Sequence, residues 1–376
     1  SVKIAHIVPY KLDAYSGVYT AIVGLVGALA RAGHDVEAWN LSPWPDGRPE
    51  LADELDAAGV VRRELPESTR PWSLTAAAKQ MIDAELDADV VHLHSAFSPQ
   101  NNLLARRTDR PLVLSPHGVL LAGSLGKSTI RKQVYRRLIE LPALKRIAAV
   151  CALTESEATE VRAFGYEGRI EVLSNGVSAP LGGVDASALR RTLNVGPEDR
   201  IALYVGRIQI DHKRLDAMAR AVAAASGWHL VIVGSDYRGD AARLASLVAG
   251  LPGADRIHLV GAKRGAELAE AYSGADVFLL LSHSEGMSMA LLEALSYALP
   301  PVVSSEVEEA LPVAASGSGW VANGDTLPEV LAGARALSDD GWAARRAAAQ
   351  ALVSGYTWQA VADGYLSLYE SVRVEA

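Results

Sequence analysis

The chain has 376 residues, of which 49% are hydrophobic and 21% are charged, and its formal net charge is −8. This length suffices for two domains with full hydrophobic cores. The acidic balance argues against a nucleic-acid-binding protein, which needs a basic surface. No apolar run is long enough to span a membrane, and the one cysteine, Cys151, excludes an internal disulfide. The sequence opens directly on a strand-like segment, which favours a cytoplasmic protein without a signal peptide.

Short apolar segments alternate with helical patterns along the whole chain, which predicts an α/β protein with parallel sheets. Strands are expected at 2–8, 35–41, 90–94, 112–116, 148–153 and 170–173, then at 201–205, 229–233, 257–260, 277–281 and 301–304. Two such sets predict two Rossmann-like domains. Because ligands of open α/β sheets bind at the carboxyl ends of the strands, the two sheets should face a central cleft.

The segment 178–183 is the best domain boundary, because it is rich in Gly and Pro and follows the turn signal Asn175-Gly176. The N-terminal domain then covers 1–178 and the C-terminal domain 179–357. The final segment, 358–376, has the pattern of an aromatic-rich amphipathic helix. It should close the second domain or cross back to the first.

Glu285 and Glu293 mark the place where a buried strand is expected to feed a helix. The helical pattern covers 287–299, and Gly286 lets the backbone approach a ligand closely. A helix N-terminus offers free N–H groups and a positive dipole end to a phosphate. This arrangement suits a nucleotide-sugar, which has phosphates in the middle and hydroxyl groups at both ends. The alternative is an ordinary helix start followed by an exposed glutamate.

Gly206 ends the first strand of the second domain, and Arg207 and Lys213 follow it in the loop. Arginine offers a planar fork to phosphate oxygens, and lysine offers a compact charge. Together they would neutralise a diphosphate without a metal ion. The alternative is two solvated cations, and the neighbours His212 and Arg214 leave the position of the second cation open by one residue.

The first domain offers two weaker signals. Gly17 precedes a helix expected from about residue 19, as in a phosphate-approach loop, but the spacing is not that of a dinucleotide fingerprint. His117 follows the fourth strand at its carboxyl end. A histidine there would donate to a substrate hydroxyl or support developing charge, whereas the alternative is a structural loop histidine.

Two patterns resemble metal sites. His92 and His94 alternate on one strand, but no third ligand stands at a useful spacing, so a structural role is favoured. Asp87 and Asp89 form an Asp-x-Asp pattern that precedes a strand and so points away from the expected cleft. No obligatory metal is therefore predicted.

The segment 127–146 carries seven basic residues against the single acid Glu140. A basic amphipathic helix can lie on anionic lipid or meet an anionic acceptor, which would give peripheral contact with a membrane. The alternative is a core-packed helix with a solvated basic face. The narrow apolar stripe favours this second interpretation.

Taken together and in this order, the segments resemble glycosyltransferase family 4, whose members are retaining enzymes of the two-Rossmann GT-B fold. The likeness rests on DVF at 276–278, Ser282, EG at 285–286, EA at 293–294, LPPVV at 299–303, YVGR at 204–207, Lys213, NGV at 175–177, DVVHLH at 89–94, PHG at 116–118, TW at 357–358, Tyr365 and Tyr369. It implies that the C-terminal helix returns to the first domain. Two positions depart from the family pattern. Ser16 precedes Gly17 where the family often has two adjacent glycines, and Pro301 follows Pro300 where many members have a single proline.

The resemblance also implies roles for single residues. Arg207 and Lys213 would hold the donor diphosphate, and Glu293 would bind the ribose hydroxyls. Glu285 would contact the donor sugar near its C3 and C4 hydroxyls. The remaining donor-site positions are Gly206 at the strand end, backbone N–H groups near Gly286, Met287 and Ser288 at the sugar and distal phosphate, Gly17 at the same phosphate, and His117 beside the sugar C6 region.

The expected reaction is transfer of a sugar from a nucleoside diphosphate, with a UDP-sugar as donor, to a hydroxyl of a glycan, glycolipid or natural product. Because no carboxylate is placed as a nucleophile, a front-face route with retention is favoured, in which Arg207, Lys213, Glu285 and His117 support catalysis. A nucleotide-sugar epimerase of the same fold and a non-catalytic sugar-nucleotide-binding protein are the alternatives.

Overall fold

The computed structural model describes residues 1–375 except residue 10, residues 14–15, 45–48, residue 71, residue 97 and residues 119–139. The chain forms two compact units. Unit 1 consists of Ser1–Gly176 together with Trp358–Ala376, and unit 2 consists of Val177–Thr357. Within the described ranges, no helix combines the length and the apolar character that crossing a membrane requires.

Unit 1 contains, in its described residues, one parallel sheet with the strand order β3-β2-β1-β4-β5-β6-β7. The order reverses between β1 and β4, which is the switch point of a Rossmann-like sheet. The strands are β1 Lys3–Val8, β2 Asp35–Asn40, β3 Val61–Glu64, β4 Val90–His94, β5 Leu112–Ser115, β6 Ile147–Ala152 and β7 Arg169–Val172.

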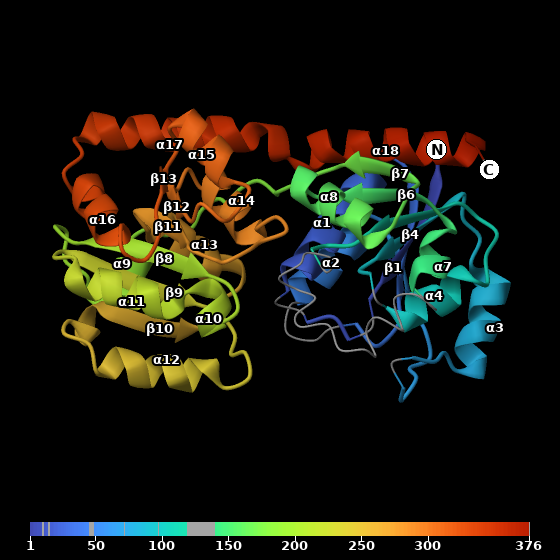
Figure 1. Cartoon of the computed structure of the whole chain (residues 1–376), viewed down its shortest axis with the longest axis horizontal. Helices are drawn as coiled ribbons and strands as arrows, with labels where there is room; N and C mark the ends of the chain where they lie inside the picture. The colour runs from blue at the N-terminus through green and yellow to red at the C-terminus, as the bar shows by residue number, and fades with distance from the viewer. Residues whose placement is uncertain are drawn as a thin grey trace. The chain divides into compact units, whose positions relative to one another are not determined.

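Helices lie on both faces of the unit 1 sheet (Figure 1). Those within the described residues are α1 Gly17–Arg31, α2 Pro49–Ala57, α3 Ala76–Glu85, α4 Pro99–Ala105, α7 Leu141–Leu144, α8 Glu155–Phe164 and α18 Trp358–Glu375. The C-terminal helix α18 belongs to this unit and packs against α1. Its first residue, Trp358, fits beside two glycines. A Cβ added to Gly24 would lie 2.1 Å from the indole, and one added to Gly176 would lie 2.5 Å from it.

Unit 2, which is described throughout, has a parallel sheet with the order β10-β9-β8-β11-β12-β13. Its strands are β8 Arg200–Val205, β9 Trp228–Val233, β10 Ile257–Gly261, β11 Val277–Leu280, β12 Pro301–Val303 and β13 Trp320–Val321. Its helices are α9 Ala188–Leu193, α10 Ile210–Lys213, α11 Leu215–Ala224, α12 Asp240–Ala249, α13 Gly265–Gly274, α14 Met289–Ser296, α15 Ala310–Ser316, α16 Leu327–Arg335 and α17 Asp339–Val353, with 3-10 turns η2 Ala254–Arg256 and η3 Ser354–Tyr356.

Asp276 anchors the strand that leads to the predicted donor site. Its side chain is 5% exposed and accepts hydrogen bonds from Arg190, Arg200 and the backbone N–H of Ile201 at 2.7–2.9 Å. These bonds tie the start of β11 to β8 and α9. Since β11 and β8 are neighbours in the sheet, the loops at their carboxyl ends emerge side by side.

The prediction of two parallel-sheet, Rossmann-like halves is confirmed, and all the expected strands are present within a residue or two of their expected ends. The sequence did not indicate β3 or β13. Both are short strands at the edges of their sheets. The β3 sequence Val-Arg-Arg-Glu has no apolar run, because its residues are half-buried or exposed.

Candidate active site

The loop after β8 contains the first predicted donor residues. Gly206 packs so tightly that a Cβ there would lie 2.7 Å from the Tyr204 hydroxyl, and this hydroxyl donates a hydrogen bond to the Arg207 carbonyl at 2.8 Å. The Arg207 guanidinium lies over the Tyr237 ring, 5.5 Å from its centre. The backbone is therefore fixed, while the exposed guanidinium stays at the surface on an aromatic support.

Lys213 and Glu285 meet directly. The Lys213 ammonium donates to a Glu285 carboxylate oxygen at 2.5 Å, and the two side chains are 14% and 15% exposed. Lys213 ends α10, a single turn whose first N–H, that of Ile210, donates to the Asp240 carboxylate at 2.9 Å. The loops after β8 and β11 thus bring a cation and an anion together, as parallel neighbouring strands allow.

The contacts of Arg214 show that Lys213, and not Arg214, is the cation that faces Glu285. Its backbone adopts a left-handed conformation with φ 54°, and its guanidinium pairs with Glu306 and with the His283 ring. Arg214 therefore serves a neighbouring loop, and Lys213 is the cation at Glu285. His212 is half-buried, and burial lowers its pKa, with the nearby Lys213 charge adding to the effect.

Helix α14 begins at the end of this loop. Ser288 caps it, since its side-chain oxygen accepts a hydrogen bond from the Leu291 N–H at 3.3 Å. The N–H groups of Met289 and Ala290 have no acceptor among the described residues. Backbone donors at the positive end of a helix favour an anion such as phosphate.

Glu309 is a site residue that the sequence reasoning missed. Its carboxylate accepts the Ser288 N–H at 3.0 Å, while its other oxygen is buried without a partner among the described residues. Burial raises the pKa of Glu309, and the nearby Glu285 adds to this rise. The signal was the acidic pair Glu308-Glu309 shortly after β12, a strand that ends at the same edge of the sheet.

Glu293 lies further along α14, on a different neighbour. The Tyr272 hydroxyl of α13 donates to its carboxylate at 2.8 Å, and the Tyr272 ring stacks on Tyr297 with centres 5.4 Å apart. The half-buried Glu293 is thereby positioned by an aromatic pair. The structure brings Lys213 and Glu285 together, whereas Glu293 lies on α14 and accepts a hydrogen bond from a different neighbour, Tyr272.

In unit 1, Gly17 is the exposed first residue of α1, which Ser16 caps by accepting the Val18 N–H at 3.2 Å. His117 follows β5 with a left-handed φ of 54°. The next residue, Gly118, donates its N–H to the buried Glu157 carboxylate at 2.5 Å, and Leu153 donates to the second oxygen at 2.7 Å. Glu157, which the sequence reasoning also missed, therefore holds the His117 loop against the end of β6.

His92 and His94 are not isolated. The sequence reasoning overlooked His6 on β1, whose Nδ1 lies 3.0 Å from His94 Nε2. His92 bonds to the Tyr369 hydroxyl at 2.6 Å and to the Ser115 hydroxyl at 2.8 Å. His6, His92 and His94 could reach one metal ion, but both nitrogens of the last two already have hydrogen-bond partners. The structural role of His92 and His94 stays a prediction.

Asp87 and Asp89 lie before β4 and take part in surface ion pairs. Asp89 accepts the Lys3 N–H at 2.9 Å and pairs with Arg373, and Asp87 pairs with Arg110. The basic segment 127–146 falls mostly outside the described residues, so its contact with a membrane or an anionic acceptor stays a prediction.

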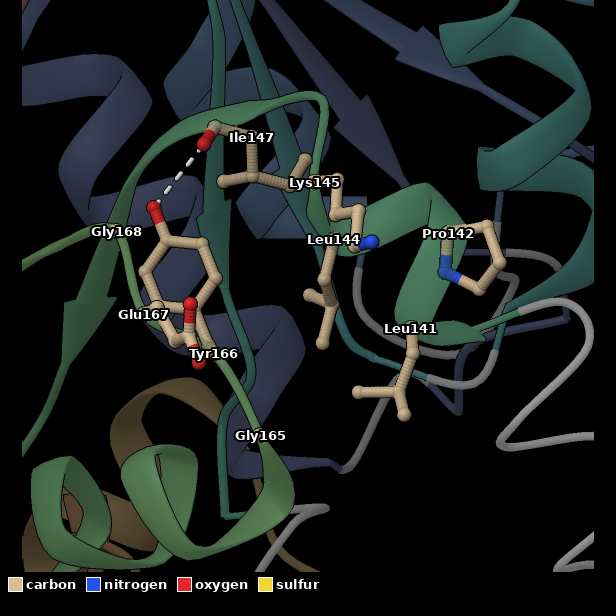
Figure 2. Close-up of a pocket in the computed structure, with 9 residues that line it drawn as sticks. All are labelled: Leu141, Pro142, Leu144, Lys145, Ile147, Gly165, Tyr166, Glu167 and Gly168. Carbon is tan, nitrogen blue, oxygen red and sulfur yellow. Dashed lines mark hydrogen bonds between the residues drawn. The ribbon is translucent and has the colours of Figure 1, made fainter.

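A cavity of about 500 Å³ lies in unit 1 beside α7 and β6 (Figure 2). Apolar side chains line much of it, and the Tyr166 hydroxyl on its wall donates to the Ile147 carbonyl at 3.0 Å. Ile147 is the first residue of β6, so the cavity opens at the amino ends of the strands. His117 stands at the opposite, carboxyl edge, where ligands of such sheets bind.

Comparisons with known proteins identify the family of both units. Residues 16–176 match the Glycosyl transferase 4-like domain, and residues 185–351 match Glycosyl transferases group 1. A GDP-mannose:cellobiosyl-diphosphopolyprenol alpha-mannosyltransferase of Xanthomonas oryzae is 28% identical over 78% of this chain and 76% of its own length. A D-inositol 3-phosphate glycosyltransferase of Kineococcus radiotolerans is 28% identical over 94% of this chain and 90% of its own.

Solved structures share the fold. Anabaena Alr3699/HepE in complex with UDP-glucose has a TM-score of 0.79 at 16% identity, covering 99% of this chain and 100% of its own. Sucrose-phosphate synthase from Thermosynechococcus elongatus has a TM-score of 0.77 at 20% identity, covering all of both chains. The two family models together span most of both Rossmann-like units, and the chain is a member of glycosyltransferase family 4, with the GT-B fold.

Proposed function

We propose that this glycosyltransferase moves a hexose from a nucleoside-diphosphate sugar to a hydroxyl group of a glycan, a lipid-linked glycan or a small-molecule acceptor. The observation that carries the proposal is the Lys213–Glu285 contact at the carboxyl ends of β8 and β11. It places a cation for phosphate beside a carboxylate for sugar hydroxyls. Arg207 in the same loop and the open N–H groups of α14 supply the remaining positive character.

Each residue has a proposed role in donor binding. Arg207 and Lys213 neutralise the diphosphate, and the N-terminus of α14 receives the distal phosphate. Glu285 accepts hydrogen bonds from hydroxyls of the transferred sugar. Glu293, held by Tyr272, accepts those of the ribose.

The chemistry follows from where charge develops. The bond between the anomeric carbon and the phosphate oxygen breaks, a bond from the acceptor oxygen forms, and the acceptor proton passes to the departing phosphate. Cations and N–H dipoles aimed at the leaving group stabilise this transition state. We propose that the sugar is delivered from the face that the phosphate leaves, which gives retention of configuration.

The base of the donor is a separate question. The sequence favoured a UDP-sugar, whereas relatives similar in sequence include mannosyltransferases named for GDP-mannose, and the structurally similar Anabaena protein was solved with UDP-glucose. The proposal therefore covers UDP- and GDP-hexoses, and a binding panel decides between them.

The test has two stages. Thermal shift with UDP, GDP, UDP-glucose and GDP-mannose identifies the donor, and mass spectrometry then follows incubation of that donor with polyprenyl-diphosphate glycans and inositol phosphates. A product heavier by one hexose, with its anomeric configuration assigned by NMR, supports the proposal. Interconversion of the donor without an acceptor would identify an epimerase, and tight binding without turnover would identify a binding protein.

A further inference from the structure

Three histidine rings of unit 1 form a hydrogen-bonded row. His6 Nδ1 lies 3.0 Å from His94 Nε2, and His94 Nδ1 lies 2.9 Å from His117 Nε2. The rings of His6 and His94 are stacked, as are those of His94 and His117. The row starts inside β1, passes through β4 and ends at the carboxyl end of β5, where His117 is half-buried.

Burial favours the neutral form of all three rings. Burial lowers the pKa of His6 to about 3 and that of His117 to about 4, and burial together with the neighbouring histidines lowers the pKa of His94 well below its usual range. A neutral imidazole has one N–H donor and one bare nitrogen. Two hydrogen bonds in a row of three neutral rings therefore require all the protons to point the same way along the row.

The surroundings do not interrupt the row. His92 stacks on His94 with ring centres 4.3 Å apart, but its nitrogens bond to Tyr369 and Ser115. The carboxylate of Glu157 on α8, which contacts the residue after His117, accepts the backbone N–H groups of Gly118 and Leu153.

The two ends of the row differ. His6 Nε2 is buried and has no partner among the described residues. If the protons pointed inward, this atom would be a buried N–H without an acceptor, a rare and costly situation. If they point outward, it is a bare nitrogen. A free histidine side chain prefers its proton on Nε2, which opposes the outward order, but that preference is smaller than the cost of burying an orphaned donor.

We propose that His94 and His6 are positioning residues that hold His117 in the tautomer with its proton on Nδ1, so that His117 presents a neutral N–H donor outward. His117 Nδ1 has no acceptor among the described residues and is the open end of the row. A neutral donor at this place suits an uncharged oxygen, such as a sugar hydroxyl. It carries no positive charge that would attract a phosphate. The proposal rests on the proposed function only in assuming that this oxygen belongs to a substrate.

The tautomer can be read directly from the full chain labelled with ¹⁵N-histidine. Two-bond ¹H–¹⁵N correlation at pH 7 separates protonated from bare ring nitrogens, and loss of one signal set in His117→Gln assigns His117. We expect a protonated Nδ1 and a bare Nε2 on His117. A protonated Nε2, or a rapidly exchanging mixture, would overturn the proposal.

Variants of His94 test the positioning. His94→Leu removes the donor to His117 Nε2, and we expect the His117 tautomer to become mixed and its pKa to rise. His94→Gln keeps a side-chain N–H donor and should restore the Nδ1–H form. His258→Gln breaks the other histidine pair, with His229 of unit 2, and should leave the His117 signals unchanged. If His94→Leu leaves the tautomer unchanged, His94 does not position His117.

The wild-type spectrum and His94→Gln decide the proposal even if His94→Leu does not fold. The spectroscopic result is independent of turnover. The expected tautomer in a chain that transfers no sugar would leave this proposal standing and reject the proposed function. An active enzyme whose His117 carries its proton on Nε2 would support the proposed function and reject the tautomer proposal.

Discussion

The Lys213 ammonium lies 2.5 Å from the Glu285 carboxylate, and each side chain is about 15% exposed. In the proposed function, Lys213 serves the phosphate of the donor and Glu285 its sugar. Without a donor, each satisfies the other. Donor binding would therefore replace the Lys213–Glu285 contact by a Lys213–phosphate contact and a Glu285–sugar contact. Part of the binding free energy is then used to weaken the ion pair.

A double-mutant cycle measures this pair. Lys213→Met or Glu285→Gln alone leaves one poorly solvated group without its partner, so each should lower the free energy of unfolding by about 1–3 kcal/mol, with the double variant losing less than the sum. Urea denaturation gives these values. Strictly additive losses would mean that the contact contributes nothing to the folded chain.

Arg207→Ala should lower kcat/KM for transfer by about 30- to 1000-fold, equivalent to about 2–4 kcal/mol of transition-state stabilisation, because a charge at the leaving group is lost. Arg238 is a matched control. Its guanidinium also lies over the Tyr237 ring, at 5.1 Å, but it follows a different strand. Equal rates for the two alanine variants would place Arg207 outside the site.

Glu293→Gln should weaken nucleotide binding by about 1.5–3 kcal/mol, the usual contribution of hydrogen bonds to a charged group. Calorimetry with the nucleoside diphosphate alone isolates the ribose contact from that of the sugar. Tyr272→Phe removes the hydroxyl that donates to Glu293 and should give a smaller loss. Unchanged affinity in Glu293→Gln would contradict the ribose role.

The pH dependence of stability distinguishes Glu309 from its neighbour Glu306. Burial raises the pKa of Glu309 above 4.5, so its contribution to stability is full below about pH 4.5 and declines as pH rises through the folded-state pKa. Arg214 lowers the pKa of Glu306, whose contribution is present above about pH 4.5 and is lost as pH falls. Glu309→Gln and Glu306→Gln should therefore shift the stability–pH curve with opposite slopes in denaturant titrations. Equal slopes would show that Glu309 is solvated.

Gly24→Ala should destabilise the protein by about 1–3 kcal/mol, because the added methyl would lie 2.1 Å from the Trp358 indole. Gly27 is the control in the same helix, where the nearest atom to an added Cβ is the flexible end of Arg31 at 3.2 Å. Gly27→Ala should be neutral or stabilising, since alanine favours helices. Thermal denaturation of both variants gives the comparison, and equal melting temperatures would show that α18 adjusts to the methyl group.

Much of the fold was readable from the sequence because the central strands are apolar runs separated by helical patterns. β3 was not, because an edge strand with two arginines needs no apolar face. The proximity of Lys213 and Glu285 was predictable in general terms, because the two residues follow β8 and β11, which are adjacent parallel strands. Glu309, Glu157 and His6 were missed because their importance depends on partners far away in sequence. The sequence around such a residue, even the acidic pair Glu308-Glu309, does not say which distant group it contacts.

The division of the chain has a consequence for biosynthesis. Unit 2 is one uninterrupted segment, whereas unit 1 needs α18, which is translated only after the whole of unit 2. Until that helix emerges from the ribosome, α1 lacks the cover of Trp358, and the hydroxyl of Tyr369 is missing from His92. Unit 1 therefore begins to be synthesised before unit 2 but is completed after it. Until then its α18-binding surface is exposed and accessible to chaperones.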